Sequence, residues 1–204
     1  MEKIEVVIAT RNPGKLREIK EILGPLGLEV LSLRDFPEIP EILEDGQTFE
    51  ENAVKKAEAI AQQTGRVAIA DDSGLAVDAL QGRPGVFSSR YAGENATDAD
   101  RYRKLLKEMA NVPEGKRGAA FICAVAIASP NGKVEVVKGE CQGKIALAPK
   151  GSHGFGYDPV FSLPQLGMTM AALEPEVKNR ISHRAKALEK LKLILPKFLK
   201  NNEE

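Results

Sequence analysis

The feature that most constrains the fold is an apolar segment near the start of the chain that passes directly into a helical pattern. Residues Ile4 to Ala9 are apolar apart from Glu5, as in a strand buried on both faces. From Pro13 onward, apolar side chains recur at helical spacing, at Leu16, Ile19 and Leu23. Asn12 is suited to the N-cap and Gly24 to the stop. A strand, a tight turn and a helix in this order predict an α/β fold.

Three later segments also have helical patterns. Thr48 to Glu51 have the spacing of a capping box, which predicts the start of a helix that runs to Gly65. Thr97 and Asp100 are placed to cap another, and the chain ends in a helix with leucines on one stripe. Pro196 should end or kink this last helix, because proline lacks a backbone N–H and crowds the preceding turn.

The strand patterns predict a mixed sheet. Val67 to Ala70 form a short apolar strand that delivers polar residues, Asp71 to Gly74, at its carboxyl end. Farther on, Ala119 to Ala128 and Lys133 to Lys138 flank Pro130-Asn131-Gly132, a sequence typical of an antiparallel hairpin. A hairpin added to strand–helix units indicates a sheet that is not purely parallel.

Length and composition limit the possible functions. The 204 residues suit one domain, residues 1–204, with two lobes. The 29 Lys and Arg side chains balance 29 Asp and Glu side chains, whereas a nucleic-acid-binding protein normally has a basic excess. No stretch approaches the roughly 18 apolar residues of a membrane helix, and Met1 to Glu5 does not resemble a signal peptide. Cys123 and Cys141 lack disulfide or metal-knuckle spacing. We expect a cytoplasmic protein without nucleic-acid or membrane partners.

The first predicted helix carries basic residues at its N-terminus, where the helix dipole disfavours cations by up to about 1 kcal/mol. Arg11, Lys15 and Arg17 gather there. A bound anion explains this arrangement, because Gly14 leaves backbone N–H groups accessible and Lys15 supplies a mobile ammonium for a phosphate. The alternative is an ordinary exposed helix start, since the segment is not the G-x-x-x-x-G-K-[ST] loop.

Acidic residues after the second predicted strand point to a metal. Asp71 and Asp72 are adjacent, and neighbours on an extended strand point to opposite faces, so the two should have different roles. Carboxylate oxygens suit magnesium, and a carboxylate can take the proton of a water that attacks phosphorus. Glu41, Glu44 or Asp45 could complete the site if their loop folds toward Asp72. The alternatives are a polar turn and a solvated acidic loop.

Two segments near the C-terminus carry further candidates. The loop Gly154-Phe155-Gly156-Tyr157-Asp158-Pro159 places two aromatic rings between glycines, either to stack on a base or sugar or to plug the core. A second group of cations gathers at the start of the last helix, with Ser182 suited as its cap: Lys178, Arg180, His183, Arg184 and Lys186. The two histidines, His153 and His183, lack the spacing of a zinc site.

Together these residues resemble the ITPase (HAM1-like) family of inosine and xanthosine triphosphate pyrophosphatases. The motifs that carry the resemblance span nearly the whole chain in the family's order: Thr10-Arg11-Asn12-Pro13-Gly14-Lys15, Thr48-Phe49-Glu50-Glu51-Asn52-Ala53, Asp71-Asp72-Ser73-Gly74-Leu75, Pro84-Gly85, Ser89-Arg90-Tyr91, Phe155-Gly156-Tyr157-Asp158-Pro159 and Ser182-His183-Arg184. The resemblance implies a two-lobed α/β fold with a central mixed sheet flanked by helices, a homodimer and Mg²⁺. It also implies hydrolysis of ITP, dITP and XTP to a monophosphate and pyrophosphate, which keeps these nucleotides out of DNA and RNA.

Matching positions in the resemblance assign the expected roles. The triphosphate would be held by Thr10, Arg11, Asn12, Pro13, Gly14, Lys15 and Lys56. Glu44 and Asp72 would bind magnesium, Asp72 would also accept the proton of water, and Ser73 would contact the substrate. The base would be lined by Phe155, Gly156, Tyr157, Asp158, Lys178, His183 and Arg184, with Phe155 stacking on the purine. Donors such as Lys178 and Arg184 would favour a 6-oxo group over the 6-amino group of adenine.

Two alternatives come from other functional classes. A general nucleotide-binding NTPase or phosphotransferase would share the cationic helix start but release or transfer orthophosphate. A non-catalytic nucleotide- or RNA-binding module would use Phe155 and Tyr157 as a stacking platform. The zero net charge argues against the RNA-binding version.

Overall fold

The structure, a computed structural model, describes residues 4–200. Met1 to Lys3, where no signal peptide is expected, and Asn201 to Glu204 lie outside this range. The chain divides into two compact units. Unit 1 comprises the residues up to Asp72, then Cys123–Gly139 and the segment from Arg184 onward. Unit 2 comprises Ser73–Ile122 and Glu140–His183. That these units act as the two lobes of one domain stays a prediction.

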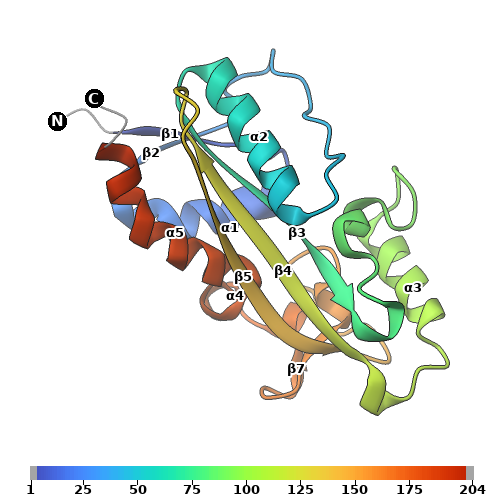
Figure 1. The fold of residues 1–204 in the computed structure, drawn as a ribbon. Coiled ribbons are helices and arrows are strands. Elements are labelled where there is room, and N and C mark those ends of the chain that lie inside the picture. The colour runs from blue at the N-terminus through green and yellow to red at the C-terminus, as the bar shows by residue number, and fades with distance from the viewer. Residues whose placement is uncertain (1–3, 201–204) are drawn as a thin grey trace. The chain divides into compact units, whose positions relative to one another are not determined.

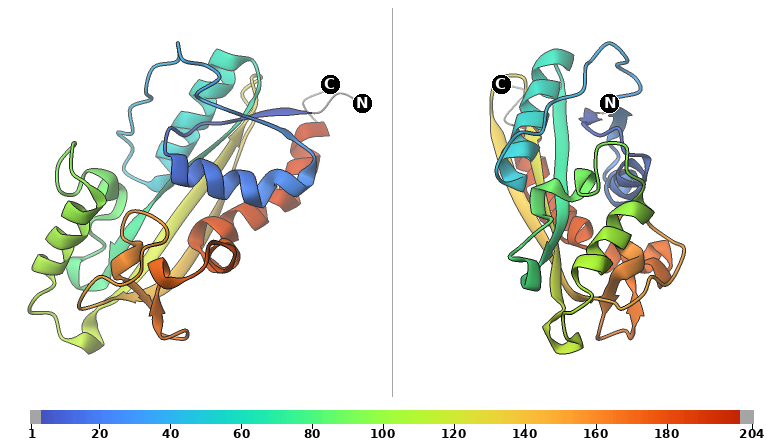
Figure 2. Two further views of the ribbon diagram at one scale, coloured as in Figure 1. Left: turned by 180° about the vertical axis from the view of Figure 1, so that it is seen from behind. Right: turned by 90° about the vertical axis from the view of Figure 1, so that its right-hand side faces the viewer.

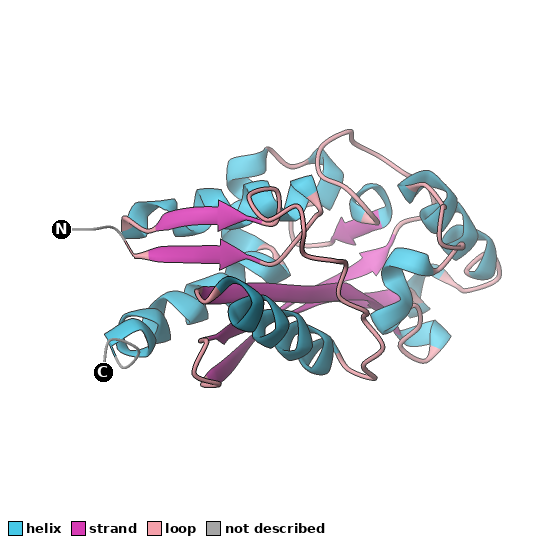
Figure 3. Cartoon of the chain, turned by 90° about the horizontal axis from the view of Figure 1, so that it is seen from above, coloured by secondary structure: helices cyan, strands magenta, loops and turns pink. Residues whose placement is uncertain are grey.

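Within residues 4–200 the strands form one mixed sheet (Figure 1). They are β1 (Glu5–Ile8), β2 (Glu29–Ser32), β3 (Val67–Val77), β4 (Gly118–Ala128), β5 (Val134–Ile145), β6 (Phe161–Leu163) and β7 (Met168–Thr169). Their order is β2-β1-β3-β4-β5-β6-β7. β1 is parallel to β2 and β3, whereas β6 is antiparallel to β5 and β7. Figure 3 shows β1 and β2 side by side, pointing the same way. The prediction of an α/β fold with a mixed sheet is confirmed.

The α-helices follow the start and stop residues that the sequence contains. They are α1 (Pro13–Leu23), α2 (Phe49–Thr64), α3 (Asp98–Glu108), α4 (Pro175–Ile181) and α5 (His183–Lys200). Asn12 caps α1, Thr48 caps α2, and Thr97 and Asp100 form a capping box on α3. Gly65 ends α2 in the left-handed conformation with φ 64°. No helix in the described part of the chain is long and apolar enough to span a membrane.

β3 is longer than its sequence pattern predicts. The pattern ends the strand at Ala70, but β3 continues through Asp71 and Asp72 to Val77. The two aspartates therefore lie in the middle of a strand, and their predicted position at a strand end is wrong. Leu75 and Val77 are fully buried in the core of unit 2. Their burial favours an extended backbone beyond the acidic pair.

α5 also departs from prediction. The helix continues through Pro196 to Lys200, so this proline does not end the helix, and a kink there, the other alternative, stays a prediction. Proline removes one helical hydrogen bond. Phe198 and Leu199, however, are buried in the core of unit 1, and their burial stabilises the last turn. α4, which precedes α5, is a helix that the sequence pattern does not predict.

In unit 1, helices cover both faces of β3. α1 and α5 share one apolar cluster with alternate residues of the strands, including Val6, Ile8, Val67, Ile69, Ile19, Leu23, Leu188 and Leu191. α2 lies on the opposite side of β3 (Figure 2). Small residues of α2 are buried there, among them Ala53 and Ala57. Successive side chains of β3 in unit 1 therefore alternate between two faces. One face packs against α1 and α5, and the other against α2.

Unit 2 has a separate apolar core. Its members come from the second half of β3, from α3, and from β4, β5 and β6, and include Leu75, Leu105, Phe121, Cys141 and Phe161. Tyr157 belongs to this cluster, and its hydroxyl donates to the carbonyl oxygen of Ser88 at 2.9 Å. Tyr157 thus fixes this segment to the core of unit 2.

Candidate functional site

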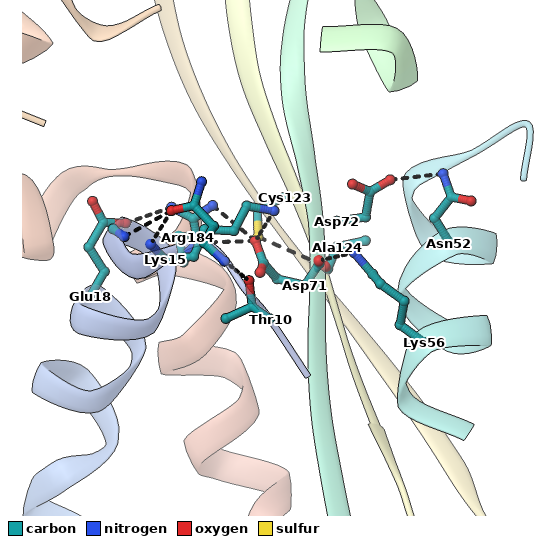
Figure 4. A network of polar contacts seen from close by, with 12 residues as sticks. Thr10, Lys15, Glu18, Asn52, Lys56, Asp71, Asp72, Cys123, Ala124 and Arg184 are labelled. Atoms are coloured by element: carbon teal, nitrogen blue, oxygen red, sulfur yellow. Dashed lines mark hydrogen bonds and ion pairs between the residues drawn. The ribbon is translucent and has the colours of Figure 1, made fainter. Parts of the chain in front are cut away.

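Asp71 and Asp72 point to opposite faces of β3, as the extended backbone requires (Figure 4). Asp71 faces α1 and α5, where it contacts Lys15 and Arg184. Asp72 faces α2, where it accepts a hydrogen bond from Asn52. The expectation that these neighbours point to opposite faces is confirmed, and that they have different roles stays a prediction.

Asp71 is held ionised by two cations. Its Oδ2 lies 3.0 Å from Lys15 Nζ and 2.9 Å from Arg184 Nη2, and the residue is 1% exposed. Burial by itself would raise the pKa of Asp71, but the charges of Lys15 and Arg184 outweigh it and hold that pKa well below its usual range. Arg184 also donates to Glu18 Oε2 at 2.6 Å. These four residues form a buried charge network, which we call the Asp71 network.

Asp72 lies in different electrostatic surroundings. Asn52 Nδ2 donates to its Oδ2 at 3.0 Å. Burial raises the pKa of Asp72 above its ordinary value, the charges of Lys56 and Lys15 oppose this rise, and the charge of Glu44 adds to it. A buried carboxylate with a raised pKa is a stronger base than an exposed one, so Asp72 is suited to take a proton from water.

Lys56 connects Glu44 to β3. Its ammonium forms an ion pair with Glu44 and donates to the carbonyl oxygen of Asp71 at 2.7 Å. Burial alone would lower the pKa of Lys56, but the negative charges of Glu44, Asp71 and Asp72 raise it instead. Lys56 therefore stays charged, which suits a group that contacts phosphate.

The carboxylates of Glu44 and Asp72 are suited to a magnesium ion whose other ligands are water and phosphate oxygens. No group of three or more His, Cys, Asp or Glu side chains within residues 4–200 is arranged to hold a metal. Glu44 and Asp72 supply two hard oxygen ligands, and magnesium at nucleotide sites often takes one or two carboxylates plus water and phosphate oxygens. Asp45, in contrast, contacts Lys55 at 2.5 Å, with its side chain 58% exposed. That Glu44 rather than Asp45 is the second ligand stays a prediction.

The start of α1 differs from the expected phosphate cradle. The Asn12 side chain accepts hydrogen bonds from Gly14 N at 2.8 Å and Lys15 N at 3.0 Å. These amides are therefore already satisfied, and the expectation that they face a phosphate directly is not met. Arg11 donates to the carbonyl oxygen of Ile39 at 2.5 Å, and the Thr10 hydroxyl accepts from Asn12 N at 3.2 Å. Side chains, above all Lys15, are left as the main candidates for phosphate binding.

In unit 2, the aromatic loop Gly154–Tyr157 is built around Asp158. The Asp158 Oδ2 accepts from Phe155 N at 3.0 Å and lies 2.5 Å from Lys178 Nζ. The Lys178 ammonium lies 4.6 Å from the centre of the Phe155 ring. A Cβ added to Gly154 would lie 2.0 Å from the same carboxylate oxygen, so glycine is needed there. Phe155 is half-buried, whereas Tyr157 is a core residue; the core-plug alternative thus applies to Tyr157.

The structure divides the predicted site residues between the units. Unit 1 contains Thr10, Arg11, Asn12, Pro13, Gly14, Lys15, Glu44, Lys56, Asp72 and Arg184, and unit 2 contains Ser73, Phe155, Gly156, Tyr157, Asp158, Lys178 and His183. His183 stacks on Phe121 with ring centres 4.7 Å apart. Arg184, expected to line the base, instead donates to two carboxylates of the Asp71 network.

Sequence reasoning missed two partners of these residues. Glu18 contacts Arg184, and Asn52 contacts Asp72. The sequence contains a signal for each, because Glu18 lies one helical turn after Lys15 and Asn52 one turn before Lys56. A polar residue on the same helical stripe as a candidate ligand is a candidate itself.

Comparisons with known proteins show which family the chain resembles in sequence and in fold. The sequence model of the Ham1 family matches residues 6–194. A dITP/XTP pyrophosphatase from Geobacillus kaustophilus is 58% identical over 187 residues, which cover 92% of each chain. Among solved structures, a HAM1 protein from Coxiella burnetii superposes with a TM-score of 0.87 at 45% identity, covering 95% of this chain and 99% of that one. The Staphylococcus aureus Ham1 protein gives 0.84 at 42% identity, covering 94% and 98%.

Proposed function

The chain belongs to the Ham1 family, and from that membership we propose that it is a nucleoside triphosphate pyrophosphatase for purines with an oxygen at C6. Relatives named dITP/XTP pyrophosphatase match 92% of the chain. It hydrolyses ITP, dITP and XTP to the monophosphate and pyrophosphate, and so keeps these non-standard nucleotides out of DNA and RNA. The observation that carries the chemistry is the pair Asp71 and Asp72, since the first is held ionised by cations and the second is a buried base.

We assign the proton transfer to Asp72. Its raised pKa makes the carboxylate able to accept the proton of a water that attacks phosphorus. Asn52, which donates to the same carboxylate, orients it. Glu44 and Asp72 would hold Mg²⁺, which when bound neutralises charge on the phosphate oxygens.

The triphosphate is assigned to cations of unit 1. Lys15 and Lys56 lie on either side of β3, next to Asp71. The raised pKa of Lys56 keeps its ammonium charged, so that it can bind a phosphate. The segment Thr10 to Gly14 shapes the turn that presents Lys15.

The purine base is assigned to the aromatic loop of unit 2. The half-buried Phe155 ring offers a stacking surface, and Lys178, held by Asp158, offers a donor to a 6-oxo group. Gly156, Tyr157, Ser73 and His183 are assigned further contacts with the substrate, and His183 stacks on Phe121. Contact of Arg184 with the base stays a proposal, because its guanidinium also donates to Asp71 and Glu18.

Three further properties follow from the family and the chemistry. The proposed assembly is a homodimer, and the proposed metal is Mg²⁺. A cytoplasmic location, where the nucleotide pool lies, fits the two free cysteines, both of which are buried. Gel filtration coupled to light scattering tests the dimer.

Product analysis tests the activity. Incubation with dITP and Mg²⁺ is expected to release pyrophosphate and dIMP in equal amounts, and addition of EDTA in excess should abolish the release. Products are separated by ion-exchange chromatography, with ATP as the comparison substrate. Orthophosphate without pyrophosphate would instead support a general NTPase.

The metal ligand can be tested by a matched pair of variants. Glu44→Gln keeps the shape but removes the charge, so the Mg²⁺ concentration for half-maximal activity should rise by at least about tenfold. Asp45→Asn, one residue later, alters an exposed carboxylate that contacts Lys55 and should leave that concentration unchanged. Equal effects of the two variants, measured by magnesium titration of the rate, would contradict the assignment.

A further inference from the structure

A hydrogen bond joins the aromatic loop to the start of α3. The Gly156 N–H donates to Asp98 Oδ2 at 2.7 Å, across 58 residues of sequence. The other oxygen of Asp98 lies 2.5 Å from Arg101 Nη1. Both contacts lie within unit 2. Asp98 therefore connects the N-terminus of α3 to the loop that contains Phe155.

The loop backbone needs such a contact at this point. Gly154 and Gly156 have φ values of 75° and 63°, in the left-handed region that glycine adopts without steric cost. Glycine also loses more conformational entropy than any other residue when its backbone is ordered. On one side Phe155 N is bound by Asp158, and on the other Tyr157 is anchored in the core. Gly156 lies between them, and Asp98 fixes its amide.

Asp98 lies at the capped N-terminus of α3. It is the first residue of α3, and Thr97 and Asp100 close a capping box around it, with Asp100 Oδ2 accepting from Thr97 N at 3.0 Å. An acidic residue at a helix start would also be favoured by the helix dipole alone. Asp100 satisfies that explanation through its hydrogen bonds with Thr97, whereas Asp98 accepts a hydrogen bond from the loop.

We propose that Asp98 is a positioning residue that fixes Gly156, and through it Phe155, for stacking on the substrate base. This inference rests on the proposed function, because it takes the loop to bind the purine. Asp98 touches neither base nor phosphate. Its loss should weaken recognition of the base and leave phosphate binding unchanged.

The variant Asp98→Ala tests the inference in the full-length protein. Loss of a hydrogen bond to a charged acceptor should speed hydrogen exchange of the Gly156 amide by about tenfold or more, measured by NMR. Calorimetry should show about tenfold weaker binding of IMP, which carries the base, and unchanged binding of pyrophosphate, which lacks it. A merely destabilised protein would lose both ligands together.

Two variants serve as controls. Asp100→Ala removes the N3 half of the capping box of the same helix and should lower the melting temperature, yet leave Gly156 exchange and IMP affinity as in the unchanged protein. Arg101→Met removes only the ion pair with Asp98. It should likewise leave Gly156 exchange and IMP affinity as in the unchanged protein. Unchanged Gly156 exchange, or unchanged IMP affinity, in Asp98→Ala would overturn the inference. If the unchanged protein itself fails to bind IMP, the proposed function fails instead.

Discussion

Replacing Asp72 by asparagine is expected to lower the turnover of dITP by about 10³-fold, within the range for loss of a general base. The amide keeps the size of the side chain but cannot accept a proton from water at neutral pH. Turnover is measured by pyrophosphate release at saturating dITP and Mg²⁺. Turnover within about threefold of the unchanged protein would remove Asp72 from the proposed mechanism.

The same variant should keep or gain stability. The folded state raises the pKa of Asp72, so at neutral pH the ionised carboxylate is less favourable in the folded protein than in the unfolded chain. Neutralising it removes that penalty. The thermal unfolding midpoint of Asp72→Asn should therefore equal or exceed that of the unchanged protein. A fall of several degrees would mean that lost turnover reflects lost structure.

Replacing Arg184 by methionine should lower the free energy of unfolding by about 3–5 kcal/mol, the cost of leaving buried partners of an ion pair uncompensated. Arg184 is 1% exposed and donates to both Asp71 and Glu18. Methionine fills the volume of the stem but cannot balance two buried carboxylates. Urea unfolding followed by circular dichroism gives the value.

An exposed arginine provides the matched control. Arg103 Nη1 lies 3.8 Å from Asp100 Oδ1, with the side chains 71% and 50% exposed. Arg103→Met should change the free energy of unfolding by less than about 1 kcal/mol, because solvent screens such a pair. Similar losses in the two variants would show that the Asp71 network does not stabilise the fold beyond an ordinary surface pair.

Local structure could be predicted closely from the sequence. The caps at Asn12 and Thr48 and the capping box at Thr97 act within three residues of themselves, so the pattern alone contains the information. The long extent of β3 and the passage of α5 through Pro196 could not be predicted this way, since burial of residues farther along decides both.

The candidate site divides in the same manner. Residue types and their order indicate phosphate chemistry at Lys15, carboxylate chemistry at the pair Asp71 and Asp72, and an aromatic loop at Phe155, and the family resemblance implies that Asp72 is the base. The partners of these residues are not contained in any local pattern. Arg184 meets Asp71 across 113 residues of sequence, and Asp98 meets Gly156 across 58.

The sequence by itself determined the elements, their caps and the chemistry that each motif can perform, because these depend on neighbours within a few residues. Only the tertiary structure decided which aspartate is held ionised by cations and which has a raised pKa. The physical reason is that adjacent residues on β3 face different helices. Lys15 and Arg184 surround Asp71, whereas Asp72 lies beside Asn52 and within the field of Glu44 and Lys56.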